Sequence, residues 1–160
     1  MIYAGYVKRV VVDGKKVNVT LWDPAGVYGH DAGHFWHNLY QESAVVVICF
    51  ALDNQNSLQS VMERWYPEVR HFCVAPILLV GCKSDLRRLL EGTECIDMSP
   101  KVITSQDALL VATEIQAAEY LECSAMKGDG ITEVIGAAVR ISDSWDRHMQ
   151  TIDHSTCRVL

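Results

Sequence analysis

The stretch APILLVGCKSDL, residues 75–86, decides the fold class. It begins as a continuous apolar run and changes after Gly81 into a polar loop that carries Lys83 and Asp85. The run SAVVVICFAL, residues 43–52, is apolar in the same way. Strands that are apolar throughout are typical of parallel sheets covered by helices on both faces. Both runs therefore predict central strands of an α/β fold.

Segments with the apolar spacing of helices follow these strands. The first is SLQSVMERWYPEVRHF, residues 57–72, and Pro67 is expected to interrupt or end it. The second is SQDALLVATEIQAAEY, residues 105–120, with Ser105 as the predicted N-cap. A last amphipathic helix is expected over residues 131–149. Alternation of strands and helices predicts a mostly parallel sheet.

The N-terminal part and the composition narrow the class of protein further. Runs rich in β-branched residues flank Asp13-Gly14, which predicts a hairpin with a two-residue turn. The net charge of −6 argues against a nucleic-acid partner. The six cysteines form no CxxC pair, which favours buried reduced thiols over a disulfide scaffold. No apolar run approaches the ~20 residues that a membrane span needs.

Short motifs follow three of the predicted strands: DPAG, GCKSDL and ECSAMK. In open α/β sheets, ligands bind at the carboxyl ends of the strands, so these motifs mark a candidate site. The side chains and amides singled out in them belong to Asp23, Gly26, Lys83, Asp85, Ser124 and Ala125. In this order the motifs resemble the guanine-nucleotide motifs of Ras-superfamily small GTPases. The resemblance covers essentially the whole chain and implies a three-layer P-loop GTPase-like fold.

Two further features resemble the Rho branch of that superfamily. WYPEVRHFC followed by PILLVGCKSDLR is similar to Rho and Rac proteins, and there is room for the Rho-type insert at about residues 86–100. The chain ends in CRVL, a prenylation box of the geranylgeranyl type with Cys157 as the lipidated residue. We therefore expect a small GTPase-like domain over residues 1–149 and a flexible tail over 150–160.

The resemblance implies a role for each residue of the two later motifs. The carboxylate of Asp85 would accept hydrogen bonds from N1 and the exocyclic amine of guanine, which selects guanine over adenine. Lys83 would pack along the base and steady the phosphate loop. The backbone amide of Ala125 would donate to the guanine carbonyl, and Ser124 would brace that loop.

The DPAG motif is expected to serve the phosphate end. Asp23 would hold Mg²⁺ through water, and the amide of Gly26 would contact the γ-phosphate. Val27 stands where the family has the glutamine that orients the attacking water, so no catalytic residue is assigned and hydrolysis is expected to be slow or absent. Cys82 replaces the Asn or Thr that usually begins the guanine motif, and Pro24 replaces a threonine.

The phosphate-binding loop itself is missing from the sequence. No GxxxxGK[ST] string occurs in the 160 residues, and Gly14 begins a GKK that belongs to the hairpin turn. The family places this loop, the first strand and the first helix ahead of a segment like Met1–Val7. The sequence therefore predicts a fold without these elements, from a truncated product, an alternative isoform or an incomplete gene model. Apolar strand edges and faces would stay exposed.

A group of histidines remains open to two interpretations. His30, His34 and His37 have the spacing of metal ligands on a helix. Gly29 and Gly33 make a helix there uncertain, and a half-buried surface loop is the alternative.

These features predict a Rho-type signalling protein that binds GTP or GDP with Mg²⁺ and regulates the actin cytoskeleton and cell polarity. Its partners would be Rho-type effectors and regulators, a prenyl-binding carrier and, through the prenyl group, a membrane. We expect it in the cytoplasm and on the cytoplasmic face of the plasma membrane. The alternative is a non-catalytic prenylated pseudo-GTPase that acts as an interaction module, or a nonfunctional fragment.

Overall fold

A computed structural model describes residues 4–23, 39–87, 102–149 and 156–159. The strands are β1 (Ala4–Val12), β2 (Lys15–Asp23), β3 (Val46–Ala51), β4 (Ile77–Cys82), β5 (Glu119–Cys123) and β6 (Thr156–Val159). The helices are α2 (Gln55–Ser60), the π-helical segment η1 (Val61–Trp65), α3 (Tyr66–Phe72), α5 (Ser105–Glu114) and α6 (Ile131–Met149).

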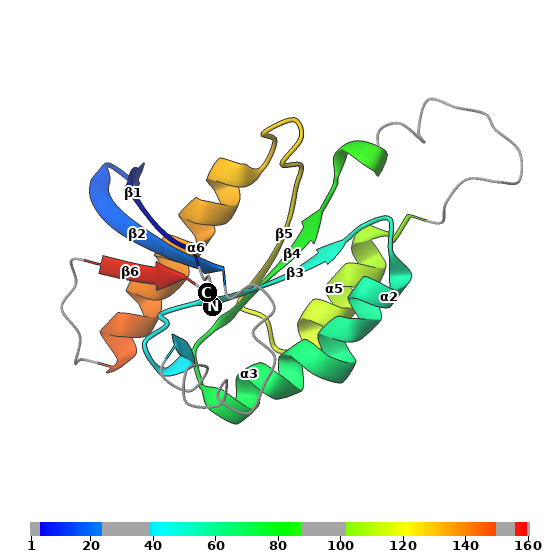
Figure 1. The fold of residues 1–160 in the computed structure, drawn as a ribbon, viewed down its shortest axis with the longest axis horizontal. Coiled ribbons are helices and arrows are strands. Elements are labelled where there is room, and N and C mark those ends of the chain that lie inside the picture. The colour runs from blue at the N-terminus through cyan, green and yellow to red at the C-terminus, as the bar shows by residue number, and fades with distance from the viewer. Residues whose placement is uncertain (1–3, 24–38, 88–101, 150–155, 160) are drawn as a thin grey trace, which may run out of the picture.

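The strands form two three-stranded sheets. One has the order β3-β4-β5 and is entirely parallel; the other has the order β1-β2-β6, in which β1 and β2 are antiparallel and β2 and β6 are parallel. The helices α2, α3 and α5 lie on one side of β3-β4-β5 and α6 lies on the other (Figure 1). The predicted three-layer α/β fold with mostly parallel strands is therefore confirmed.

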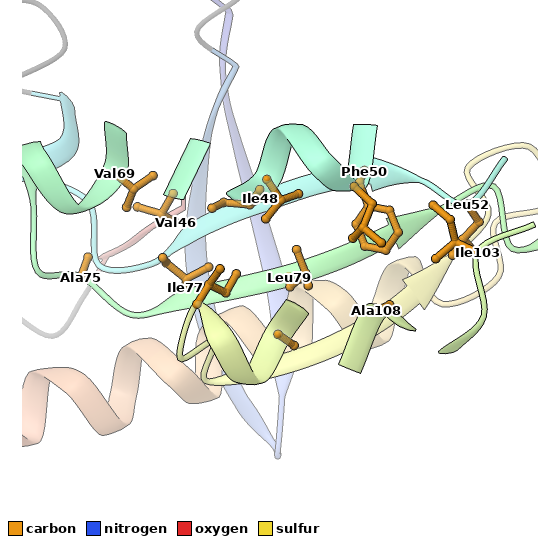
Figure 2. Packing of buried hydrophobic residues seen from close by; sticks show 14 of the residues in the cluster. Val46, Ile48, Phe50, Leu52, Val69, Ala75, Ile77, Leu79, Ile103 and Ala108 are labelled. Atoms are coloured by element: carbon orange, nitrogen blue, oxygen red, sulfur yellow. The ribbon is translucent and has the colours of Figure 1, made fainter. Parts of the chain in front are cut away.

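Of the two strands predicted to be central and buried on both faces, β4 is confirmed, whereas β3 is at the edge of this three-stranded sheet and is fully buried on one face only, with Cys49 exposed on the other. In β3, Val46, Ile48 and Phe50 pack with the helices α2, α3 and α5 (Figure 2), and Val45 just before it packs on the side of α6. In β4, residues 77–80 are all at most 1% exposed, which covers both faces of the strand. Because β4 lies between β3 and β5, it is the centre of this sheet.

The N-terminal hairpin also forms as predicted. Its turn residues Asp13 and Gly14 have φ angles of 49° and 77°, and Val12 pairs with Lys15 across the turn. Positive φ at both central residues defines a type I′ turn, whose twist matches that of the flanking strands.

Pro67 interrupts the predicted helix but does not end it. The backbone N–H of Tyr66 donates to the carbonyl of Val61, five residues back, so the chain makes a π-turn before the proline. Pro67 then stands in the first turn of α3; it has no N–H to donate to the preceding turn, which is why the regular α-helical pattern is interrupted here. The helix continues to Phe72 with Val69 in the core.

The N-cap of α5 is Thr104, and the prediction of Ser105 is wrong by one residue. The backbone N–H of Asp107 donates to the Thr104 hydroxyl, and the Asp107 carboxylate accepts from the Thr104 N–H, which completes a capping box. Ser105 is the first residue of the helix. Both residues have hydroxyl side chains, so composition alone did not separate them.

Replacing Thr104 by alanine should lower the free energy of unfolding by about 1 kcal/mol, because the cap hydrogen bond is lost. The matched control is Thr113→Ala in the last turn of the same helix, where Thr113 is exposed. The control should not destabilise the chain, because alanine has the higher helix propensity. Urea denaturation followed by circular dichroism measures both; equal losses would show that the cap contributes nothing.

Part of the predicted flexible tail is a strand. Thr156–Val159 forms β6, which pairs in parallel with Asn18–Leu21 of β2. The expectation of a loose tail over 150–160 is therefore wrong for these four residues. A four-residue segment carries too little local pattern to be recognised as a strand; here it pairs with an edge that β2 leaves open opposite β1.

Candidate functional site

The loops after β4 and β5 are joined directly to each other. The backbone N–H of Ser84 donates to the carbonyl of Cys123 over 3.0 Å. The hydroxyl of Ser124 donates to Oδ1 of Asp85 over 2.6 Å. Because β4 and β5 are neighbouring parallel strands, their carboxyl ends meet at one edge and these contacts follow. The structure thus brings together Lys83, Asp85, Ser124 and Ala125, as the sequence predicts.

Asp85 is a buried carboxylate in a defined orientation. The residue is 7% exposed, and Ser124 beside it is fully buried. The Ser124 hydroxyl also accepts from the backbone N–H of Lys127 over 3.2 Å, so one hydroxyl connects the carboxylate to the loop after β5. Rotation of the Asp85 side chain would break the buried hydrogen bond, which costs about 1–3 kcal/mol.

The loop after β5 is closed by a glycine turn. The backbone N–H of Ser124 donates to the carbonyl of Asp129 over 2.9 Å, and both Gly128 and Gly130 have φ of +75°. A Cβ at Gly130 would lie 2.4 Å from the carbonyl oxygen of Glu122. Only glycine fits there, because the conformation is left-handed and the backbone of β5 is in contact.

Lys83 connects the guanine motif to the end of β3. Its Nζ lies 2.9 and 3.0 Å from the two carboxylate oxygens of Asp53. The side chain of Lys83 is 53% exposed, so this ion pair is worth at most about 1 kcal/mol. Lys83 itself has φ of +67°, which turns the chain out of β4 toward Asp85. Asp53 follows a predicted strand but belongs to none of the three motifs, so its pairing with Lys83 was not predicted from the sequence.

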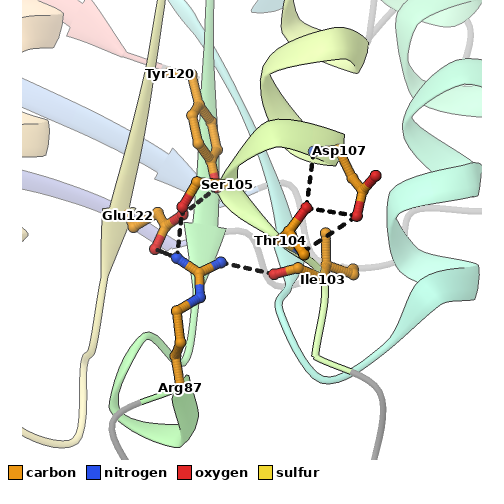
Figure 3. A network of polar contacts seen from close by, with 7 residues as sticks. All are labelled: Arg87, Ile103, Thr104, Ser105, Asp107, Tyr120 and Glu122. Atoms are coloured by element: carbon orange, nitrogen blue, oxygen red, sulfur yellow. Dashed lines mark hydrogen bonds and ion pairs between the residues drawn. The ribbon is translucent and has the colours of Figure 1, made fainter. Parts of the chain in front are cut away.

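A polar network anchors the other end of the same loop (Figure 3). Nη1 of Arg87 contacts Oε2 of Glu122 at 2.5 Å and the Ser105 hydroxyl at 2.7 Å, and Nη2 donates to the carbonyl of Ile103 at 2.6 Å. Glu122 also accepts from the hydroxyls of Ser105 and Tyr120. The network ties the loop after β4 to β5 and to the start of α5. No local sequence motif predicts this network, because it joins three segments that are distant in the chain.

The charge of Glu122 is stabilised by these neighbours. Burial works to raise the pKa of this carboxyl, but hydrogen bonds from Arg87, Tyr120 and Ser105 outweigh it and hold the pKa below its usual value. A carboxyl with a lowered pKa in the folded state stabilises the fold above its unfolded pKa. That stability is lost as the pH falls through the folded pKa.

Replacing Glu122 by glutamine should lower the free energy of unfolding at pH 7 by about 1–3 kcal/mol, because the half-buried Arg87 and Tyr120 lose a charged acceptor. At about pH 3, below the unfolded pKa of glutamate of about 4.3, the difference from the wild type should be smaller, and it should disappear once the pH is below the folded pKa. Urea denaturation at both pH values measures this. Glu114→Gln, on the exposed side of α5, is the control and should change stability by no more than about 0.5 kcal/mol. A difference that does not depend on pH would contradict the assigned role of the charge.

The residues of the DPAG motif, which were predicted to contact Mg²⁺ and the phosphates, are not brought to the loops after β4 and β5 by the described part of the structure. Asp23 is the last residue of β2 and is exposed, in the sheet that does not contain β4 and β5. Gly26, Val27 and the three histidines lie outside the described residues, as do residues 88–100 of the predicted insert. Cys157 is in β6. The ligand-binding roles of all these residues stay predictions.

The described ranges contain no candidate metal site and no candidate membrane-spanning helix. Within residues 4–23, 39–87, 102–149 and 156–159, no group of three or more histidine, cysteine or acidic side chains has an arrangement that could hold a metal ion. In the same part of the chain, none of the helices has the length and apolar character needed to cross a bilayer.

The fold and this loop arrangement define a Ras-like GTPase domain. A model of the Ras family matches residues 2–143 of the chain. The chain therefore belongs to the Ras family.

The relatives place it in the Rho branch. The GTP-binding protein RHO1 of Candida albicans is 43% identical over 143 residues, which cover 88% of this chain and 71% of that protein. The GTP-binding protein rho5 of Schizosaccharomyces pombe is 43% identical, with 88% and 70% covered. Human Rho-related GTP-binding protein RhoB is 39% identical over 161 residues, with 99% and 81% covered.

Proposed function

We propose that this chain binds guanine nucleotides through the loops after β4 and β5 and serves as a Rho-type signalling protein. The observation that carries the proposal is the 2.6 Å hydrogen bond by which Ser124 orients the buried carboxylate of Asp85. A carboxylate fixed at the carboxyl edge of a parallel sheet is a specific acceptor in the place where α/β folds bind ligands.

The acceptor pattern of Asp85 suits guanine. Guanine presents two neighbouring donors, N1–H and the exocyclic amine on C2, whereas adenine has an unprotonated N1, only a hydrogen on C2, and its amine on C6, where guanine has a carbonyl. One ionised carboxylate can accept from both donors, and it has no hydrogen to offer to adenine. The backbone N–H of Ala125, one residue after Ser124, would donate to the guanine carbonyl.

Fewer residues of this sequence are candidates for binding the phosphates of the nucleotide than for binding its base. The string GxxxxGK[ST], whose amides and lysine hold phosphates in P-loop proteins, does not occur in the 160 residues. Asp23 is the residue that would hold Mg²⁺ through water, and Mg²⁺ would neutralise phosphate charge. Val27 has no group that can orient a water molecule, so we expect slow or absent hydrolysis. The proposal is therefore binding of the base half, without efficient catalysis.

The signalling role draws on the relatives, several of which are named as GTP-binding proteins of the Rho group. By this likeness the chain would act on the actin cytoskeleton and cell polarity, with Rho-type effectors and regulators as partners. Cys157 in the CRVL ending would carry a prenyl group. That group would hold the protein on the cytoplasmic face of the plasma membrane, and a prenyl-binding carrier would extract it. A single prenyl chain gives only limited anchoring.

A thermal melt of residues 1–160 with GDP and Mg²⁺ tests the proposal. A ligand that binds only the folded state adds RT ln(1 + [L]/Kd), about 2.7 kcal/mol at a hundredfold excess over Kd. We expect a rise in the melting temperature with GDP and none with ADP. Equal shifts with both nucleotides would contradict guanine recognition by Asp85.

The second candidate is the non-catalytic interaction module, which Val27 at the position of the catalytic glutamine favours. The same melt separates the two candidates. A cooperative transition that GDP does not move would support the interaction module. Absence of a cooperative transition would mean that residues 1–160 do not fold alone, and it would overturn both.

A further inference from the structure

Three cysteines lie in a row on one face of the sheet β3-β4-β5. Cys82 pairs directly with Cys123 in the β4-β5 ladder. Cys49 pairs with Val80, two residues before Cys82, so Cys49 and Cys82 are diagonal neighbours. Side chains alternate along a strand, and Val80, Cys82 and Cys123 all pack in the cluster on the α6 side. Cys49 faces the same side.

The three thiols differ in exposure. Cys123 is buried, Cys82 is half-buried and Cys49 is exposed. On the opposite face of β3, Ile48 and Phe50 are at most 5% exposed. The α6 face is therefore left open at Cys49, and a small oxidant or electrophile from solvent reaches this sulfur before the other two.

The thiols also differ in acidity. Contact with the neighbouring Cys82 thiol is the largest influence on the Cys49 thiol and lowers its pKa. The same contact is the largest cause of a raised pKa at Cys82, followed by burial. Burial also raises the pKa of Cys123, to about 11, and that of Cys73 on the other side of the core. Among the four cysteines whose side chains the structure describes, Cys49 is thus the one that most readily forms a thiolate, which is the reactive form.

We propose that Cys49 and Cys82 form a redox-active dithiol, in which Cys49 reacts with a hydroperoxide and Cys82 resolves the product as an intramolecular disulfide. The Cys49 thiolate attacks one peroxide oxygen: an S–O bond forms, the O–O bond breaks, and the leaving hydroxide or alkoxide takes a proton. The sulfur loses two electrons and the peroxide gains them. The sulfur of Cys82 then attacks that of Cys49, an S–S bond forms, and the hydroxyl leaves as water with the Cys82 proton.

Closure of this bridge acts on the loop with Lys83 and Asp85. Diagonal neighbours on adjacent strands have Cα atoms about 7–8 Å apart, whereas a disulfide needs about 4.4–6.8 Å. The end of β4 must therefore shift toward β3. Cys82 is the last residue of β4, so the shift passes to the guanine motif. This consequence rests on the proposed function; the dithiol itself does not.

The first experiment maps the bridge in the 160-residue chain after treatment with hydrogen peroxide and blocking of free thiols. Trypsin releases Cys73 and Cys82 in one peptide between Arg70 and Lys83, so Cys73→Ser is the matched control. We expect the peptide containing Cys49 to be linked to this peptide in the wild type and in Cys73→Ser, and free in Cys82→Ser. A bridge that survives Cys82→Ser, or no bridge to Cys49, would overturn the proposal.

The second experiment compares alkylation rates by iodoacetamide, which needs no disulfide. Cys49 should react several times faster than Cys73 in the wild-type chain. Cys82→Ala, which removes the donor, should slow Cys49, whereas Cys82→Ser keeps a hydroxyl donor and should restore the rate. Equal rates at Cys49 and Cys73, or no effect of Cys82→Ala, would overturn the assignment. Neither readout requires nucleotide, so a failed GDP melt leaves the result interpretable.

Discussion

Replacing Leu79 by alanine is expected to lower the free energy of unfolding by about 2–5 kcal/mol, the loss typical of a buried leucine. Leu79 is fully buried in the middle of β4, where it packs with Ile48 of β3 and Ala108 of α5 in one cluster (Figure 2). The loss combines the transfer of the side chain to water with the cavity left behind. Because a domain of this size is stable by about 5–15 kcal/mol, the change removes a large fraction of the total.

Leu110→Ala is the matched control for this prediction. Leu110 is 66% exposed on α5, on the same helix that covers Leu79. Its removal should change stability by no more than about 0.5 kcal/mol. Urea denaturation by circular dichroism measures both variants. Similar losses in the two would mean that β4 is not the centre of the core.

Replacing Asp85 by asparagine is expected to abolish stabilisation by GDP while leaving the unliganded chain nearly as stable. The asparagine Oδ1 can still accept from Ser124, so the buried hydrogen bond survives. The amide, however, presents N–H groups to the two guanine donors. Each hydrogen bond to a charged group contributes about 1.5–3 kcal/mol, so affinity for GDP should fall by about 3–6 kcal/mol.

The same variant should gain affinity for a different base. Xanthine carries a carbonyl where guanine carries the exocyclic amine, and an amide N–H can donate to it. Xanthosine diphosphate should therefore raise the melting temperature of Asp85→Asn and leave that of the wild type unchanged. Glu114→Gln again serves as the control and should keep the response to GDP. A variant Asp85→Asn that still responds to GDP would show that Asp85 does not contact the base.

The parts of the fold that local pattern decides were predictable. The continuous apolar runs at residues 43–52 and 75–82 predicted two strands, of which β4 is buried on both faces and β3 on one, and the Asp13-Gly14 pair accepts the positive φ of a tight turn. Spacing also located α6 to the residue. Because the ends of neighbouring parallel strands must meet, the proximity of Asp85 and Ser124 followed from the same patterns.

Contacts between residues that are distant in the chain could be identified only in the tertiary structure. Glu122 and Arg87 are 35 residues apart, and neither has a local sign of the ion pair that anchors the loop. The strand β6 forms because β2 has an open edge to which it can pair. The four residues of β6 are too few to predict a strand from their own sequence. Cys49 looks like any core residue in its apolar run, but it is exposed next to Cys82. The sequence alone determined the apolar strands, the helices and the edge of the sheet where the loops with Asp85 and Ser124 lie. Folding decided β6 and the contacts between these loops, because their energy arises only when separate segments meet.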